Sequence, residues 1–285
     1  MTLQPITPEL RRWIVAQAQA GRRPEDIVAS MQRSGWDAAV AAQAMESVLT
    51  RQLDETAARQ DAPAVIGGHR PDPDLDGSPC GIEIEGHRID VLVTLARPRV
   101  VVFGRLLADD ECDGLVELAR PRLARSETVH TGSGGSEINA ARTSDGMFLA
   151  RGETELVARI ERRLAALVRW PVERGEGLQV LRYRPGAEYR PHHDYFDPAQ
   201  PGTATVVQRG GQRLGTVVMY LSSPQGGGAT TFPEAGLAVA PVKGHAVFFG
   251  YDRPHPSTLT LHGGAPVLAG GKWVATKWLR ERRFD

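Results

Sequence analysis

The 285-residue sequence contains only two cysteines, Cys80 and Cys112, and no Cys-x-x-Cys pair. Two cysteines cannot form the disulfide framework of a small secreted protein, and without a Cys-x-x-Cys pair there is no cysteine-based zinc site. We expect both side chains to be reduced thiols.

The sequence also lacks net charge, because 34 Lys and Arg residues balance 34 Asp and Glu residues. A balanced chain has no electrostatic reason to bind nucleic acid or an anionic membrane. No run reaches the ~18 apolar residues of a membrane span, and the N-terminus lacks the three-part pattern of a signal peptide. We therefore expect a cytoplasmic protein that binds neither nucleic acid nor a membrane.

The composition is that of a folded chain, with 41% hydrophobic and 24% charged residues. Wholesale disorder and collagen-like sequence are excluded. Because single domains usually have ~100–200 residues, the length indicates one large domain with a small appendage, or two domains.

Residues 1–60 are predicted to form a small helical bundle. Thr7 precedes a proline at the first helical position, and Leu10, Trp13 and Ile14 follow at helical spacing. The bundle faintly resembles ubiquitin-associated domains. It is a candidate for recruiting a protein partner.

Residues 61–90 are predicted to be a linker, because Gly67-Gly68 and Pro71-Asp-Pro-Asp74 break regular structure. Beyond it, residues 91–285 form the predicted main domain. Helices are expected near 108–119 and 153–168, followed from Leu178 by short β-rich runs between Gly and Pro. The fold class is therefore α+β, an antiparallel barrel or jelly roll with supporting helices.

The strongest local motif is His192-x-Asp194. Side chains two apart on a strand share a face, so this pair can chelate a metal ion. A second histidine would complete the 2-His-1-carboxylate triad that holds iron(II) and leaves positions open. His255 lies between two prolines, whereas His262 ends a strand-like run, and we therefore select His262 as the third ligand.

Lys272 opens the last strand-like run, which extends to Leu279. Strand alternation places Lys272 on the face opposite that of Trp273 and Lys277. A lysine inside a barrel is costly unless an anion neutralises it. If Lys272 faces inward, metal and cation together suit the two ends of 2-oxoglutarate; otherwise Lys272 faces solvent.

Several further motifs give the chain a resemblance to a known family. They occur in that family's order and close to its spacing: Arg142-Thr-Ser144, Glu176-Gly-Leu-Gln-Val-Leu-Arg-Tyr183, His192-x-Asp194, Gly211-Gln-Arg213, Gly226-Gly-Gly-Ala-Thr-Thr-Phe232, Lys243-Gly-His-Ala-Val-Phe-Phe249, His262-Gly-Gly-Ala-Pro and Lys272-Trp. From Pro98 to Leu279 the sequence resembles iron(II)- and 2-oxoglutarate-dependent dioxygenases of the prolyl 4-hydroxylase type.

The resemblance implies a double-stranded β-helix, or jelly-roll, fold and a set of site residues. His192, Asp194 and His262 would ligate Fe(II), and with Lys272 they would be the catalytic residues. Lys272 and Tyr183 would bind the distal carboxylate of 2-oxoglutarate. The residues that would grip a proline-containing peptide are Glu176, Tyr189, Arg213 and Trp278. Where family members can carry a histidine two residues after this tryptophan, the chain has Arg280.

The implied function is hydroxylation of a prolyl residue in a peptide or protein. The reaction would consume 2-oxoglutarate and O2, yield succinate and CO2, and use ascorbate as reductant. Three alternatives stay open: hydroxylation of a free amino acid or other small molecule, a zinc-dependent hydrolase, and a non-catalytic barrel that only binds. The hydrolase is weakened because no His-Glu-x-x-His motif is present. Residues 131–141 and 196–210 are candidate lids.

Overall fold

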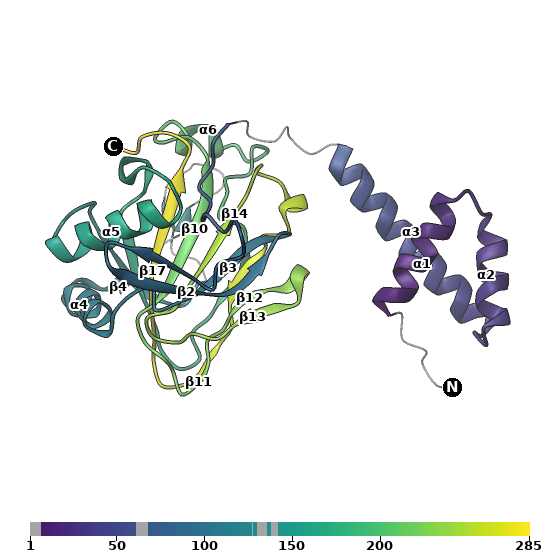
Figure 1. Ribbon diagram of the computed structural model, residues 1–285, viewed down its shortest axis with the longest axis horizontal. Coiled ribbons are helices and arrows are strands. Elements are labelled where there is room, and N and C mark those ends of the chain that lie inside the picture. The colour runs from purple at the N-terminus through teal and green to yellow at the C-terminus, as the bar shows by residue number, and fades with distance from the viewer. Residues whose placement is uncertain (1–6, 61–67, 127, 130–135, 138–141) are drawn as a thin grey trace. The chain divides into compact units, whose positions relative to one another are not determined.

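The computed structural model describes residues 7–60, 68–126, 128–129, 136–137 and 142–285. The chain divides into two compact units, Met1–Ala62 and Pro63–Asp285, which we call the helical unit and the sheet unit (Figure 1). Within the described ranges, no helix has the combined length and apolar character needed to cross a bilayer.

The described part of the helical unit consists of α1 (Pro8–Gln19), α2 (Pro24–Arg33) and α3 (Ala38–Gln60). Thr7 Oγ1 accepts the backbone N–H of Leu10 at 3.3 Å, which caps the start of α1. The three helices share one buried cluster: Ile14, Ile27, Met31, Ala41, Ala44 and Val48. The likeness to ubiquitin-associated domains stays a prediction.

The strands described in the sheet unit pair antiparallel throughout. The large sheet has the order β1-β2-β3-β14-β10-β17-β8-β7-β4, and the small sheet has the order β13-β12-β15-β9. Two further pairs are β11–β16 and β5–β6. Two antiparallel sheets with helices agree with the predicted α+β class and are consistent with a jelly roll.

The strand bounds are β1 (Gly81–Ile84), β2 (His87–Leu95), β3 (Arg99–Gly104), β4 (Ala124–Arg125), β5 (Thr128–Val129), β6 (Ser136–Glu137), β7 (Asp145–Leu149), β8 (Leu178–Tyr183), β9 (Tyr189–His192), β10 (Arg213–Tyr220), β11 (Gly226–Gly227), β12 (Thr230–Phe232), β13 (Leu237–Val239), β14 (Ala246–Gly250), β15 (His262–Gly264), β16 (Val267–Ala269) and β17 (Lys272–Arg280). The α-helices are α4 (Asp109–Ala119), α5 (Glu155–Leu167) and α6 (Thr203–Val206). Single 3₁₀ turns span Arg120–Arg122, Val172–Arg174, Pro233–Ala235 and Pro256–Thr258.

Residues 81–90 are not linker, because they form β1 and the start of β2. The two strands are joined at Glu85 and Gly86, whose φ angles of 51° and 75° give the backbone twist of a tight hairpin turn. Strand β9 ends at His192, two residues before Asp194. Asp194 therefore lies beyond the strand rather than within it.

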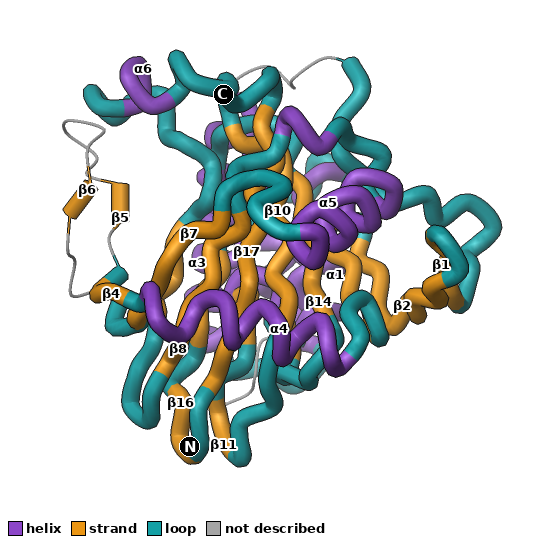
Figure 2. Tube along the Cα trace, turned by 90° about the vertical axis from the view of Figure 1, so that its left-hand side faces the viewer, coloured by secondary structure: helices purple, strands orange, loops and turns teal. Residues whose placement is uncertain are grey.

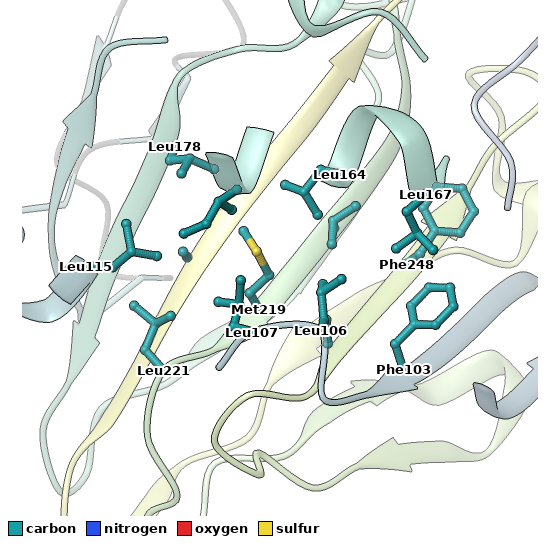
Figure 3. Close-up of a cluster of buried hydrophobic side chains, with 14 of the residues drawn as sticks. Phe103, Leu106, Leu107, Leu115, Leu164, Leu167, Leu178, Met219, Leu221 and Phe248 are labelled. Carbon is teal, nitrogen blue, oxygen red and sulfur yellow. The ribbon is translucent and has the colours of Figure 1, made fainter. Parts of the chain in front are cut away.

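Helices α4 and α5 lie across one face of the large sheet (Figure 2). The main core packs there, as Figure 3 shows, and its labelled members are Phe103, Leu106, Leu107, Leu115, Leu164, Leu167, Leu178, Met219, Leu221 and Phe248. A second buried cluster joins side chains of both sheets, among them Phe232 from β12 and Phe249 from β14. The interior between the sheets is thus separate from the core under the helices.

Strand β17 is buried along all nine of its residues. Trp273 and Ala275 belong to the core under the helices, whereas Val274 belongs to the cluster between the sheets. Because side chains alternate along a strand, Lys272 shares the face of Val274. Of the two orientations considered for Lys272, the structure has the inward one.

Candidate active site

Two histidines and an aspartate meet where β9 and β15 pair. His262 is the register partner of His192, and directly opposed side chains of neighbouring strands start only ~5 Å apart. Asp194 joins them from just beyond the end of β9. One ligand atom from each residue lies within 4.8 Å of the other two. The structure therefore brings together the three residues selected from sequence.

Backbone carbonyls orient both imidazole rings. Nδ1 of His192 lies 2.9 Å from the oxygen of Arg190, and Nδ1 of His262 lies 3.0 Å from that of Thr260. A carbonyl only accepts, so each Nδ1 carries the proton and donates. In a neutral imidazole with its proton on Nδ1, Nε2 has the free lone pair that a metal ion needs, and here each Nε2 lies 3.5 Å from an Asp194 carboxylate oxygen. Such outer hydrogen bonds are typical of metal-binding histidines.

The ionisation states also suit a divalent ion. Burial lowers the pKa of His262 to about 4, so the ring is neutral at pH 7. Burial acts to raise the pKa of Asp194, but the neighbouring His262, His192 and Arg213 outweigh it and hold this pKa below the usual range. One carboxylate and two imidazole nitrogens form a donor set that fits iron(II).

His255, the other candidate ligand, lies outside this group. It precedes the turn Pro256–Thr258, and its Nδ1 accepts the backbone N–H of Ser257 at 3.1 Å. Its role in the structure is to cap this turn.

Lys272 is a buried cation in the same interior. It is 4% exposed, and its register partner is Tyr183, whose ring centroid lies 5.3 Å from Nζ. A Cβ added to Gly264, two residues after His262, would lie 3.8 Å from Nζ. Within the described part of the chain no carboxylate pairs with Lys272, and burial lowers its pKa to about 8. An anionic ligand would remove this cost.

Lys277 occupies the opposite face of β17. Its Nζ donates to the buried carboxylate of Glu161 on α5 and to the backbone oxygen of Glu176. Lys277 therefore has its counter-ion within the protein. Of the two buried lysines, Lys272 is thus the one without a carboxylate partner among the described residues.

Two predicted substrate residues are bonded to each other. Arg213 donates to both carboxylate oxygens of Glu176, at 2.8 and 3.0 Å, and to the backbone oxygen of Asp194 at 3.3 Å. Arg280 donates to the same carboxylate at 2.9 Å. Burial acts to raise the pKa of Glu176, but Arg213 and Arg280 outweigh it and lower this pKa.

Of the other two predicted substrate residues, Tyr189 contacts the metal-binding group and Trp278 contacts Arg213. The Tyr189 ring stacks on His192 at a centroid distance of 3.7 Å. The Trp278 ring lies 4.0 Å from the guanidinium carbon of Arg213, and its buried Nε1–H has no acceptor among the described residues. Tyr189 therefore lies directly beside His192, whereas Trp278 lies beside Arg213, which donates to the backbone oxygen of Asp194.

Two residues of this region were not selected from sequence. The guanidinium of Arg142 lies 4.8 Å from the Tyr189 ring centroid, and it donates to Gln179 Oε1 at 2.8 Å. Gln179 lies on β8, where alternation with Tyr183 would have placed it on the inward face. Arg142 opens the Arg142-Thr-Ser144 motif, but its pairing with Tyr189 arises only through tertiary structure, so the motif alone assigned it no contact in the site.

The two candidate lids differ in how far the structure describes them. Within residues 131–141, 131–135 and 138–141 lie outside the described residues. The segment 196–210 contains α6 (Thr203–Val206), and Arg280 donates to the backbone oxygens of Val206 and Arg209. This segment is thus tied to the end of β17. The lid function of both segments stays a prediction.

The comparisons of this chain with known proteins agree with one another. The 2OG-Fe(II) oxygenase superfamily model matches residues 178–280. Prolyl 4-hydroxylase 5 of Arabidopsis thaliana is 42% identical over 209 residues, covering 66% of this chain and 70% of that protein. Prolyl 4-hydroxylase 2 of the same plant is 38% identical over 213 residues, covering 67% and 70%.

A solved structure also matches. The viral collagen prolyl hydroxylase of Paramecium Bursaria Chlorella virus-1, in complex with 2OG, has a TM-score of 0.50 and 29% sequence identity. The match covers 64% of this chain and 95% of the viral one.

Proposed function

Because this chain belongs to the prolyl 4-hydroxylase family, we propose that it hydroxylates a prolyl residue of a peptide or protein and converts 2-oxoglutarate and O2 to succinate and CO2. One observation carries the proposal: the His192–Asp194–His262 group lines the same buried interior as Lys272, a cation that no carboxylate of the described residues pairs with. The comparisons do not favour the small-molecule, hydrolase or non-catalytic alternatives.

Fe(II) is assigned to Nε2 of His192, Nε2 of His262 and the Asp194 carboxylate. When bound, Fe(II) would supply the redox chemistry by which one oxygen atom of O2 enters the cosubstrate and the other enters the substrate. The chain holds these donors in place by two Nδ1–H bonds to backbone carbonyls. The two sheets around them are assigned to the double-stranded β-helix form of the jelly roll.

The distal carboxylate of 2-oxoglutarate is assigned to Lys272, with Tyr183 beside it. The ammonium has no counter-ion among the described residues, so a carboxylate would complete an ion pair inside the protein. The proposed chemistry therefore depends on a dicarboxylate.

The affinity for 2-oxoglutarate should depend on pH through Lys272. Burial lowers the pKa of Lys272 to about 8 in the ligand-free protein. Below pH 8 the ammonium is charged, and the dissociation constant for 2-oxoglutarate should not change with pH. Above pH 8 the neutral amine of Lys272 must take up a proton before it can pair with the carboxylate, so the dissociation constant should rise about tenfold per pH unit. Titrations of the metal-loaded protein with 2-oxoglutarate, at several pH values between 6.5 and 9.5, measure this dissociation constant. A constant that stays flat through pH 9.5 would contradict the assignment.

The peptide is assigned to the side of the site formed by Tyr189, Trp278, Arg213 and Glu176. The Nε1–H of Trp278, which finds no acceptor in the part of the chain that the structure describes, suits a peptide carbonyl. The two aromatic rings suit the apolar ring of proline. Glu176 and Arg213 are already paired, so their main contribution is to hold this wall of the site in shape.

Arg280 should affect peptide binding more than cosubstrate binding. It links the Glu176 carboxylate to the backbone of segment 196–210. Arg280→Ala removes this link, and we expect the KM for peptide to rise about tenfold, equivalent to about 1.4 kcal/mol, without change in the KM for 2-oxoglutarate. Steady-state kinetics with each substrate varied in turn measure both constants.

Arg282 offers a matched control for this prediction. It is exposed and donates to the backbone oxygen of Val207, in the same segment, at 3.1 Å, without contacting Glu176. Arg282→Ala should therefore leave the KM for peptide within about twofold. If the two variants changed the KM for peptide equally, the proposed role of Arg280 in peptide binding would be contradicted.

The function itself is tested with proline-rich peptides incubated with protein, Fe(II), 2-oxoglutarate and ascorbate. Mass spectrometry should find a gain of one oxygen atom on a prolyl residue, with one succinate formed for each hydroxyl group. Unmodified peptides throughout would oppose a peptide substrate. The use of ascorbate, the cytoplasmic location and partner recruitment by the helical unit stay predictions.

A further inference from the structure

A hydroxyl group contacts the carboxylate of the proposed metal site from the large sheet. Thr216 Oγ1 lies 2.8 Å from Asp194 Oδ2 and 3.0 Å from the phenol oxygen of Tyr251. Thr216 is 0% exposed and Tyr251 is 3% exposed. The three groups form a short chain that water does not reach.

The chemistry of the groups fixes the direction of these hydrogen bonds. An ionised carboxylate only accepts, so Thr216 donates its single hydroxyl proton to Asp194. Thr216 Oγ1 is then left as an acceptor for the phenol proton of Tyr251. Tyr251 thus orients the Thr216 hydroxyl, and Thr216 orients the carboxylate.

Asp194 needs this support because its backbone lies outside the sheet. Strand β9 ends at His192, so no strand pairing fixes the Asp194 side chain. Its backbone oxygen accepts from Arg213, but this contact leaves rotation of the carboxylate free. Among the described residues, Thr216 is the hydroxyl that reaches the carboxylate.

We propose that Thr216, oriented by Tyr251, is a positioning residue that holds the Asp194 carboxylate facing His192 and His262. The inference rests on the proposed function, because it assumes that these three residues bind the metal ion. Thr216 itself does not contact substrate or metal. It lowers the cost of binding by fixing one ligand before the ion arrives.

The test is metal affinity without peptide, so that turnover plays no part. The metal-free protein is titrated with Co(II), followed by calorimetry and by the visible absorption of the bound ion. Thr216→Val removes the hydroxyl at nearly constant shape and should weaken Co(II) binding about 10- to 100-fold. Thr216→Ser keeps the hydroxyl and should stay within about threefold of the unsubstituted protein.

Tyr251→Phe provides a second variant in case Thr216→Val does not fold. It removes the donor that orients Thr216 and should weaken Co(II) binding by a smaller factor, about 3- to 10-fold. The matched control is Thr230→Val. Thr230 is also buried and bonded to a tyrosine, with 2.8 Å between its Oγ1 and the phenol oxygen of Tyr220, but Asp194 is not its partner. Thr230→Val should therefore leave the affinity for Co(II) unchanged.

The outcomes separate the two claims. Unsubstituted protein that binds no Co(II) overturns the proposed metal site itself. Normal binding by the unsubstituted protein, with equal affinity in Thr216→Val and Tyr251→Phe, overturns the positioning role alone. A loss in Thr230→Val as large as that in Thr216→Val also overturns it, because any buried hydroxyl would then have the same effect.

Discussion

Replacing His262 with alanine is expected to lower turnover at least about a thousandfold and to weaken Fe(II) binding strongly. His262 contributes one of the three donors, and its Nε2 lies 3.5 Å from Asp194 Oδ2. Two remaining donors hold a divalent ion poorly, and a factor of a thousand corresponds to about 4 kcal/mol of transition-state stabilisation. Succinate formation and metal content of the purified variant measure the two effects.

His255 supplies the matched control. It caps the turn Pro256–Thr258 and lies outside the metal-binding group. His255→Ala should lose at most about 1 kcal/mol of stability and retain metal content and most of the turnover. If His255→Ala instead lost the metal and His262→Ala kept it, the assignment of the third ligand would be wrong.

Replacing Lys272 with methionine is expected to weaken 2-oxoglutarate binding about a hundredfold or more while stabilising the ligand-free protein. The bound carboxylate would lose its ion-pair partner in a buried site, which costs about 3 kcal/mol. In the absence of ligand the ammonium is buried without a counter-ion among the described residues, so removing it relieves a burial cost. Calorimetric titration with 2-oxoglutarate and thermal unfolding measure the two opposite effects.

Lys277→Met should show the reverse pattern. Lys277 pairs with Glu161, whose side chain is 1% exposed, so the variant leaves a buried carboxylate without its partner. We expect a loss of about 3–5 kcal/mol in the free energy of unfolding and unchanged 2-oxoglutarate affinity in the folded fraction. Adding Glu161→Gln removes the stranded charge if the single variant is too unstable. A Lys272→Met protein that binds 2-oxoglutarate normally would refute the cation's role.

Local sequence patterns were sufficient to select His192, Asp194, His262 and Lys272 as candidate site residues. His192 and Asp194 are two residues apart, and proline neighbours disfavoured His255. Alternation along β17 separated Lys272 from Lys277, and the interior position of Lys272 then followed from the structure. These patterns select candidates only: Asp194 lies beyond the end of β9, so strand alternation does not by itself place it beside His192.

The supporting residues could not be selected, because they depend on register between distant strands. Thr216 and Tyr251 meet Asp194 only once β10, β14 and β9 are assembled. The partners of Arg280 likewise come from segments far away in sequence. The β1–β2 hairpin was missed for another reason. The Pro- and Gly-rich residues before it suggested a linker, and the turn places Glu85 at a positive φ instead of the Asn or Asp that usually signals a two-residue hairpin.

The central claim is that His192, Asp194 and His262 hold one divalent ion next to the cation Lys272. The most direct measurement is anomalous diffraction from crystals grown without O2 in the presence of Mn(II) and 2-oxoglutarate. We predict one strong peak within bonding distance of all three side chains, with the distal carboxylate of 2-oxoglutarate at Lys272 Nζ. A peak elsewhere, or 2-oxoglutarate bound away from Lys272, would contradict the account.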